Sequence, residues 1–339
     1  MNTKNRFLAG LFLLVVLFSS CNDFQEINED PNQVDESKVK PEWFLNGSVI
    51  GDQMNPEIAE RIFIITWNRA SRFNRGSGFT IGTDNNDYMT LYLGNSYSVK
   101  WLNLATKAVQ LGEKKVADGE AELFPYYKNV IQMARIWRAY LNSEVSDGFG
   151  PIPALDAFSG VPAEYNSVEE IYSFILKELK EAEAALDPSI DMSDMANEDA
   201  FYAGNVNMWK KYANSLRMRL AMRIVNANPA LAQAEFEDAA SKGYISSLSE
   251  LAGVQEKDGW SDLTSVMSRT WNAQAMSVTF KNLVVGLGNI EFPLPDSLKS
   301  HLKNPRTYMG LYLDKHFPLT TNDPCAGFYF DGIPQYVDP

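Results

Sequence analysis

Apolar residues recur at every third or fourth position over most of the chain after Val39, and this spacing predicts amphipathic helices. The clearest stripe covers residues 205–228, where charged side chains occupy the remaining faces. Similar stripes predict helices over residues 56–67, 88–116, 123–145 and 167–186. The stripe of 205–228 consists of Trp209, Tyr212, Ala213, Leu216, Leu220, Ile224 and Ala227.

Capping residues mark where these helices begin and end. Ser167 followed three positions later by Glu170 forms a capping box, and Pro188 ends that helix. The pair Asn228–Pro229 ends one helix and starts the next, which runs to Gly243. Helices paired by short turns predict a mainly all-α fold of tetratricopeptide-like helix-turn-helix repeats.

Long irregular insertions separate the helix pairs. They are rich in Gly, Asn, Asp and Pro and cover residues 74–87, 148–166, 188–204 and 246–268. Insertions of this length in a helical scaffold commonly carry function. The segment from Asn289 onward is rich in proline and is expected to be irregular.

The first twenty residues have the pattern of a lipoprotein signal. Lys4 and Arg6 precede an apolar run over residues 7–18, and two serines then precede Cys21. The run is too short for a permanent membrane span. We therefore expect cleavage before Cys21, acylation of Cys21 itself, a polar tether over residues 21–38, and one domain over 39–339.

Composition excludes several kinds of function. The chain of 339 residues has 30 basic and 43 acidic side chains, and the resulting charge of −13 disfavours binding to nucleic acid. It has two His and two Cys, so no zinc ribbon, His-rich metal site or disulfide framework is expected. No cofactor is expected either.

Several sequence motifs follow one another along the chain. After the lipoprotein cysteine comes Asn-Glu-Asp-Pro-Asn at residues 28–32. The most specific block covers residues 199–220, with a Tyr-x-Gly element followed by Trp-x-Lys-Tyr-Ala-Asn-Ser-Leu. Further motif segments are 135–140 with 146–153, 167–186, 304–306 and 332–334. In this order they resemble the SusD/RagB-like nutrient-binding outer-membrane lipoproteins of the Bacteroidetes.

The resemblance implies a surface-exposed, lipid-anchored protein of the outer membrane that caps a SusC-like TonB-dependent transporter. Such proteins capture oligosaccharide or peptide nutrients and do not cleave them. Members of the family continue beyond the Gly-Ile-Pro element at 332–334, so the repeat domain is expected to be incomplete at its C-terminus. Whether a chain ending at Pro339 is a functional short form or a truncated product stays open, and an uncapped last repeat predicts low stability.

A sugar-binding surface needs flat aromatic rings flanked by amide, carboxylate and guanidinium groups. Such residues gather around the first insertion, and a second, weaker group includes Trp271. The alternative for each aromatic residue is a packing role at the end of a helix. The candidate ligand-binding residues are Trp67, Asn68, Arg72, Phe73, Asp84, Asp87, Tyr88, Tyr92 and Trp271.

Several other conspicuous residues are predicted to have structural roles. Trp137 and Trp209 lie inside helical stripes and are predicted to belong to the core. Arg217, Arg219 and Arg223 could form a basic binding strip, but their helical spacing favours ion pairs between helices.

Asp147 could be a catalytic acid but is more simply an Asx-type turn residue. Two alternative functions stay open: a glycoside hydrolase, which requires a pair of carboxylates, and a repeat scaffold that binds only protein.

Overall fold

The structure is a computed structural model, and it describes residues 38–53, 71, 74–76, 89–160, 162–254 and 274–276. The predicted acylation site, Cys21, and the predicted helix over 56–67 lie outside these residues. The chain divides into two compact units, Met1–Lys40 and Pro41–Pro339. All helices described below belong to the second unit. The predicted signal, tether and repeat-domain boundaries remain predictions.

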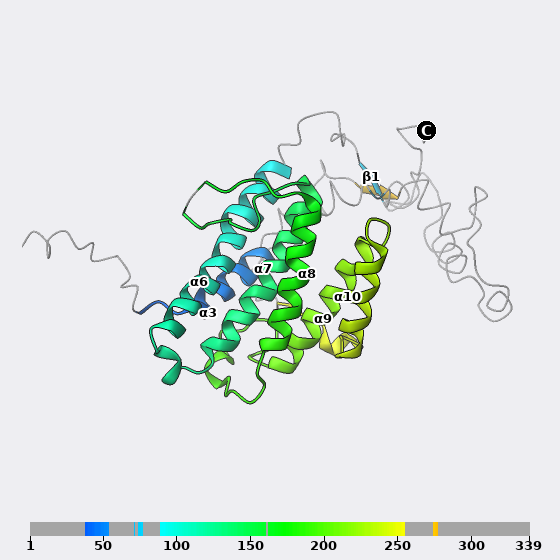
Figure 1. Cartoon of the computed structure of the whole chain (residues 1–339). Coiled ribbons are helices and arrows are strands. Elements are labelled where there is room, and N and C mark those ends of the chain that lie inside the picture. The colour runs from blue at the N-terminus through cyan, green and yellow to red at the C-terminus, as the bar shows by residue number, and fades with distance from the viewer. Residues whose placement is uncertain are drawn as a thin grey trace, which may run out of the picture. The chain divides into compact units, whose positions relative to one another are not determined.

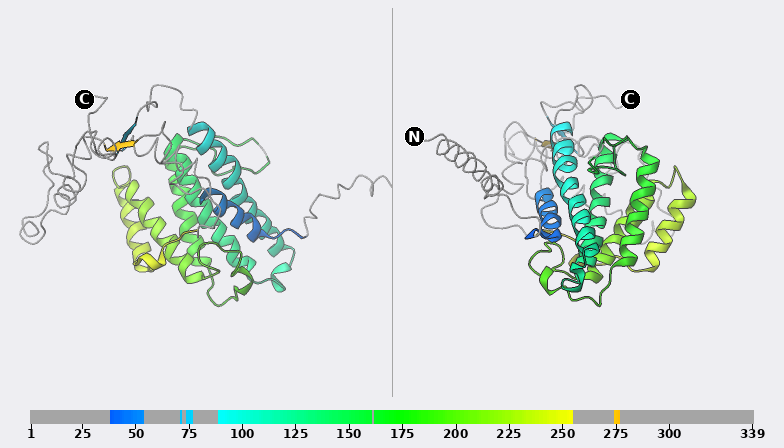
Figure 2. Two further views of the ribbon diagram at one scale, coloured as in Figure 1. Left: turned by 180° about the vertical axis from the view of Figure 1, so that it is seen from behind. Right: turned by 60° about the vertical axis from the view of Figure 1, so that its left-hand side comes forward.

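The described part of the second unit is mainly helical, as predicted. From α6 onward, each helix packs against the one before it, and the turns between them make neighbours antiparallel (Figures 1 and 2). This is the arrangement of stacked helical hairpins. The principal elements are α3 (Pro41–Gln53), η4 (Met89–Leu102), α6 (Asn103–Ala117), α7 (Tyr127–Phe149), α8 (Val168–Ala185), α9 (Val206–Arg223) and α10 (Pro229–Ser241).

Some boundaries differ from those predicted. The single helix expected over 88–116 is a wide π-helical segment, η4, followed by α6. The helix expected over 205–228 ends at Arg223, and residues 224–227 form the turn into α10. Helix α8 has the predicted capping box, in which Ser167 and Glu170 satisfy each other's backbone N–H groups. Asn228 caps α10, as expected from the Asn-Pro pair.

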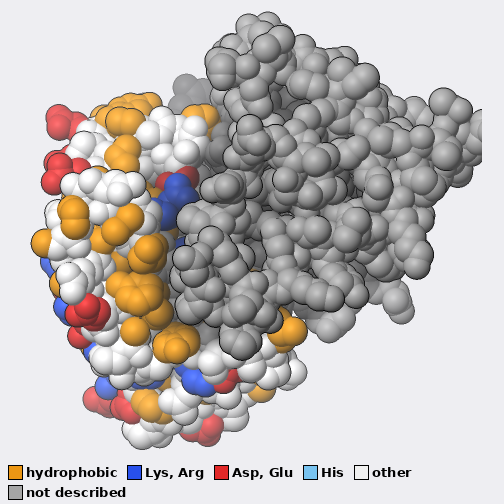
Figure 3. Space-filling view, turned by 90° about the vertical axis from the view of Figure 1, so that its right-hand side faces the viewer, with side chains coloured by type: hydrophobic (Ala, Val, Ile, Leu, Met, Phe, Trp, Pro, Cys, Tyr) orange, Lys and Arg blue, Asp and Glu red, His pale blue; other side chains and the backbone are white. Residues whose placement is uncertain are grey.

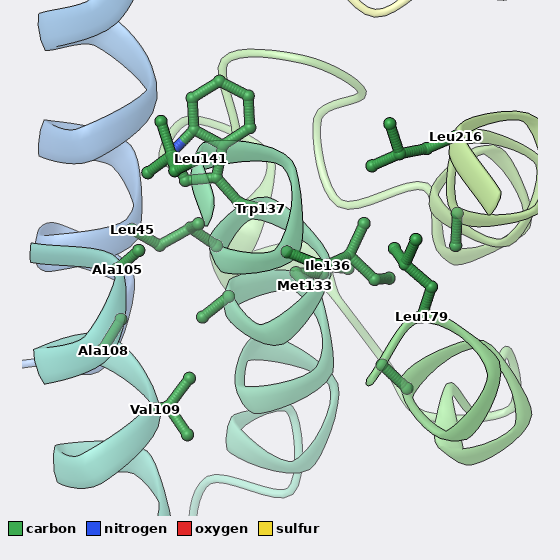
Figure 4. Close-up of a cluster of buried hydrophobic side chains, with 14 of the residues drawn as sticks. Leu45, Ala105, Ala108, Val109, Met133, Ile136, Trp137, Leu141, Leu179 and Leu216 are labelled. Atoms are coloured by element: carbon green, nitrogen blue, oxygen red, sulfur yellow. The ribbon is translucent and has the colours of Figure 1, made fainter. Parts of the chain in front are cut away.

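The hydrophobic core is arranged around α7. Residues from α6 lie on one side of α7, and residues from α8 and α9 lie on the other side (Figure 4). Trp137 of α7 is 1% exposed, so its predicted place in the core is confirmed. Because the neighbouring helices bury their apolar side chains against it, α7 is the central helix of the described unit.

Helix α3 is held to this core by polar contacts as well as apolar ones. The indole N–H of Trp137 donates to Ser48 Oγ at 2.8 Å, and Ser48 Oγ donates to the carbonyl oxygen of Trp101 at 2.7 Å. The hydroxyl of Tyr126 donates to Glu42 Oε1 at 2.8 Å. Burial and the carboxylate of Glu42 both raise the pKa of Tyr126, which stays a neutral donor.

The surface on the α10 side carries gathered apolar side chains between charged ones (Figure 3). Met222 in the last turn of α9, Val225 in the turn after it and Tyr244 after α10 are among the exposed apolar residues of the described chain. Within the described ranges, no helix combines the length and hydrophobicity needed to cross a membrane.

Candidate functional site

The residues predicted to bind ligand lie largely outside the described part of the chain. Tyr92 lies in η4, but its side chain is outside the description as well. The proposed ligand-binding roles of these residues therefore stay predictions. The others outside the description are Trp67, Asn68, Arg72, Phe73, Asp84, Asp87, Tyr88 and Trp271.

Two short strands connect the chain segments that contain these candidates. Strand β1 (Asn74–Gly76) pairs antiparallel with β2 (Gln274–Met276), with Arg75 opposite Ala275. Phe73 directly precedes β1, and Trp271 lies three positions before β2. The pairing thus joins the first insertion to the chain segment of the second candidate group, which lies far from it in the sequence. A three-residue pairing across some two hundred positions has no local signal in the sequence.

The most specific sequence block, residues 199–220, has a structural explanation. The carboxylate of Asp199 accepts hydrogen bonds from the backbone N–H groups of Phe201 and Gly204 and from the indole N–H of Trp209, the last at 2.7 Å. Gly204 has φ of +81°, and a Cβ there would lie 3.0 Å from the carbonyl oxygen of Met192. Asp199 therefore holds the Tyr-x-Gly turn against the first turn of α9. Trp209 is fully buried, which confirms that it is a core residue.

The arginines of α9 form ion pairs between helices, as their spacing predicted. Arg217 is fully buried and pairs with Glu235 and Asp238 of α10. Arg223 pairs with Asp147 of α7 at 2.9 Å, and Arg219 lies 3.8 Å from Glu144. These contacts join α9 to its neighbours on both sides, so the arginines do not form a separate basic strip.

Asp147 is neither a turn residue nor a free acid. It lies in the last turns of α7, where its Oδ1 accepts from the hydroxyl of Tyr172 at 2.7 Å and its Oδ2 pairs with Arg223. The prediction of an Asx-type turn was wrong because α7 continues to Phe149, four residues beyond the predicted end. Burial and Asp147 raise the pKa of Tyr172 to about 12, so the tyrosine remains a donor.

Glu144 and Asp147 share one feature with a catalytic carboxylate pair: the pKa of one carboxyl group, that of Glu144, is raised. Burial raises the pKa of Glu144, with a smaller contribution from Asp147 in the same direction. A glycosidase nucleophile or base needs a carboxylate oxygen free to reach the sugar or a water. Both oxygens of Asp147 are already bonded to Tyr172 and Arg223. The pair is therefore better explained as a junction between α7, α8 and α9.

A second polar junction joins α7 to α8. Glu178 of α8 accepts from Arg135 at 2.8 Å and from Arg138 at 2.5 Å. Burial alone would raise the pKa of Glu178, but the two guanidinium groups outweigh it and hold that pKa below its usual value. Nowhere in the described ranges do three or more potential ligand side chains form a metal-binding group.

The described geometry thus defines a helical-repeat scaffold whose polar clusters are structural and whose candidate ligand residues lie in the insertions. A family model described as SusD-like, Susd and RagB outer membrane lipoprotein, matches residues 26–291. The chain belongs to this SusD-like family. No curated protein matches the chain.

Solved structures of SusD homologs have a similar fold. A SusD homolog from Parabacteroides distasonis is 24% identical, with a TM-score of 0.60 over 76% of this chain and 50% of its own. A chitin-binding SusD homolog from Flavobacterium johnsoniae is 22% identical, with a TM-score of 0.56 over 73% and 51%. A further chitin-binding protein is 21% identical, with a TM-score of 0.60 over 80% and 54%. The chain spans about half the length of each.

Proposed function

We propose that this protein is an outer-membrane lipoprotein, anchored through Cys21, that captures an oligosaccharide or peptide and delivers it to a SusC-like TonB-dependent transporter. The observation that carries the proposal is the family match over residues 26–291, because the family is described as outer membrane lipoproteins. An anchor of two or three acyl chains would hold the body at the membrane permanently. The acylated Cys21 would also keep captured ligand close to the transporter.

Glycan is the ligand class that we favour. Two of the similar solved proteins are named as chitin-binding. The predicted ligand residues supply aromatic rings for stacking on sugar rings and Asn, Asp and Arg side chains for hydroxyl groups. The β1–β2 pairing supports one shared surface, since it joins the segments that hold Phe73 and Trp271. Capture without cleavage fits the helix junctions, where Asp147 and Glu178 already bond to arginines of neighbouring helices or of α7.

The anchor and the partner can be tested together. The protein is isolated from native outer membranes in mild detergent, and whatever copurifies in stoichiometric amount is identified by mass spectrometry. We expect a large β-barrel transporter in the eluate. Cys21→Ala should move the protein from the membrane to the soluble fraction, and unchanged membrane attachment of this variant would refute the anchor.

Ligand binding is tested by calorimetry with chitin oligosaccharides as the probe. The double variant Trp67→Ala with Tyr92→Ala should bind at least tenfold more weakly, because loss of each of the two aromatic contacts costs about 1 kcal/mol and a tenfold change in affinity corresponds to about 1.4 kcal/mol. Its helix content should not change. Trp43→Ala, at a half-exposed position of α3, is the matched control and should bind normally. Loss of helicity in the double variant would show instead that these aromatics pack in the core.

A further inference from the structure

Two polar residues of α9 hold the chain segment that follows α10. This segment, residues 243–251, is called the strap below, and it runs from the middle of α9 back toward the start of that helix (yellow in Figure 1). Asn214 Nδ2 donates to the carbonyl oxygen of Gly243 at 2.9 Å. The N–H of Ile245 donates to Ser215 Oγ at 2.8 Å. The Asn-Ser pair in the most specific sequence block therefore binds the backbone of the strap.

Glu250 attaches the other end of the strap. Its carboxylate pairs with Lys211 of α9 and accepts from the N–H of Ser246 at 2.8 Å. Its carbonyl oxygen accepts from the hydroxyl of Tyr202 at 3.0 Å. Lys211 and the N–H of Ser246 lower the pKa of Glu250 to about 2, so this carboxylate is charged at neutral pH. Glu250 thus connects the strap both to α9 and to the turn that precedes α9.

These polar contacts are not reinforced by apolar burial. Every residue of the strap is half-buried or exposed, and the apolar side chain of Leu248 is 87% exposed. In contrast, α10 packs along α9, buries Ala232 and Ala239, and pairs with the fully buried Arg217. Segments that bury few apolar side chains open at a lower cost in free energy than packed helices do. The strap should therefore detach from α9 more easily than α10 does.

We propose that the strap is a conformational latch, which opens and closes on α9 as a separate unit and is held closed by the ion pair between Lys211 and Glu250. The pair is partly exposed, so salt weakens it and favours the open strap. When closed, the strap fixes where the chain leaves α9 on its way to the segment that contains Trp271 and β2. The latch concerns contacts within the chain and does not depend on the proposed function.

Residue-resolved hydrogen exchange on the full chain tests the latch. The N–H of Ile245 is the reporter, because it bonds to Ser215 and not to Glu250. In Glu250→Gln its exchange should rise about tenfold or more, as expected for loss of a hydrogen bond between charged groups, while exchange in α10 stays unchanged. Lys211→Met should have the same effect, and Lys211→Arg should keep the slow exchange of wild type. Glu122→Gln, at an exposed position between α6 and α7, is the matched control and should change nothing.

Salt provides a second measurement that needs no variant. Raising NaCl to about 1 M should speed exchange at Ile245 relative to α10 in wild type, and should have little further effect in Glu250→Gln, where the ion pair is already lost. Unchanged exchange at Ile245 in Glu250→Gln would overturn the latch. An equal rise in the strap and in α10 would also overturn it, because the two would then open as one unit. If Glu250→Gln does not fold, the salt response of wild type alone decides between these outcomes.

Discussion

The carboxylate of Glu178 is ionised at a position where burial alone would favour its neutral form. Its bonds to Arg135 and Arg138 lower its pKa, so Glu178 stabilises the folded state at every pH at which its carboxylate is charged. We expect Glu178→Gln to lower the free energy of unfolding by about 2–3 kcal/mol at neutral pH, because two partly buried guanidinium groups lose their charge partner. Urea unfolding followed by circular dichroism measures this loss.

The pH dependence of that loss has a definite sign. A carboxyl group whose folded pKa lies below its unfolded value stabilises the fold above the unfolded pKa, here 4.5. The contribution disappears as the pH falls through the folded pKa. Wild type and Glu178→Gln should therefore converge in stability in acid. Glu181→Gln removes a half-exposed partner of Arg135 and should cost less than about 1 kcal/mol. Equal losses for the two variants would contradict this account.

Single residues were predicted well where their burial follows from local spacing. Trp137 and Trp209 occupy the inner face of regular helices, so periodicity alone identified them as core. Their hydrogen-bond partners, Ser48 and Asp199, could not be predicted, since one lies 89 positions away and the other depends on the path of a turn. For the candidate ligand residues, the sequence offers only residue type and clustering.

At the scale of one element, α8 depends on its N-terminal cap. Ser167 Oγ accepts from the N–H of Glu170, and the carboxylate of Glu170 accepts from the N–H of Ser167 at 2.7 Å. Ser167→Ala should therefore lower the free energy of unfolding by about 1 kcal/mol. Ser173→Ala, at an exposed position within the same helix, is the control and should be neutral or slightly stabilising. Thermal and urea unfolding of both variants compare the two positions, and a loss at Ser173 as large as at Ser167 would argue against the cap.

Helices with strong local signals were predicted, and elements that depend on distant partners were missed. The stripe and cap of α8 gave nearly correct boundaries. Helix α3 was not predicted, because Gly47 and Gly51 weaken its helical signal and its stabilising partners, Trp101 and Trp137, lie far along the chain. The β1–β2 pairing was missed for the same reason.

At the scale of the whole described unit, the helices differ in how many neighbours support them. Helix α7 packs against α3, η4, α6, α8 and α9, whereas α10 packs mainly against α9. In a stacked array, stability is close to a sum of each repeat and its neighbouring interfaces. Among the described helices, α10 should therefore open more easily than the central α7, and local opening of α10 should not require unfolding of α7.

Native-state hydrogen exchange tests this gradient on the full chain. We expect the slowest exchange in α7 and the fastest helical exchange in α10. Ala239→Gly, at a fully buried position of α10, should cost about 1 kcal/mol and raise exchange there about fivefold while leaving α6 and α7 unchanged. Ala134→Gly is the matched change in α7 and should raise exchange throughout the described helices, because opening α7 removes the partner of each neighbouring helix. Uniform exchange across the helices, or an equal response of α7 to both variants, would show that the unit unfolds as a single cooperative body.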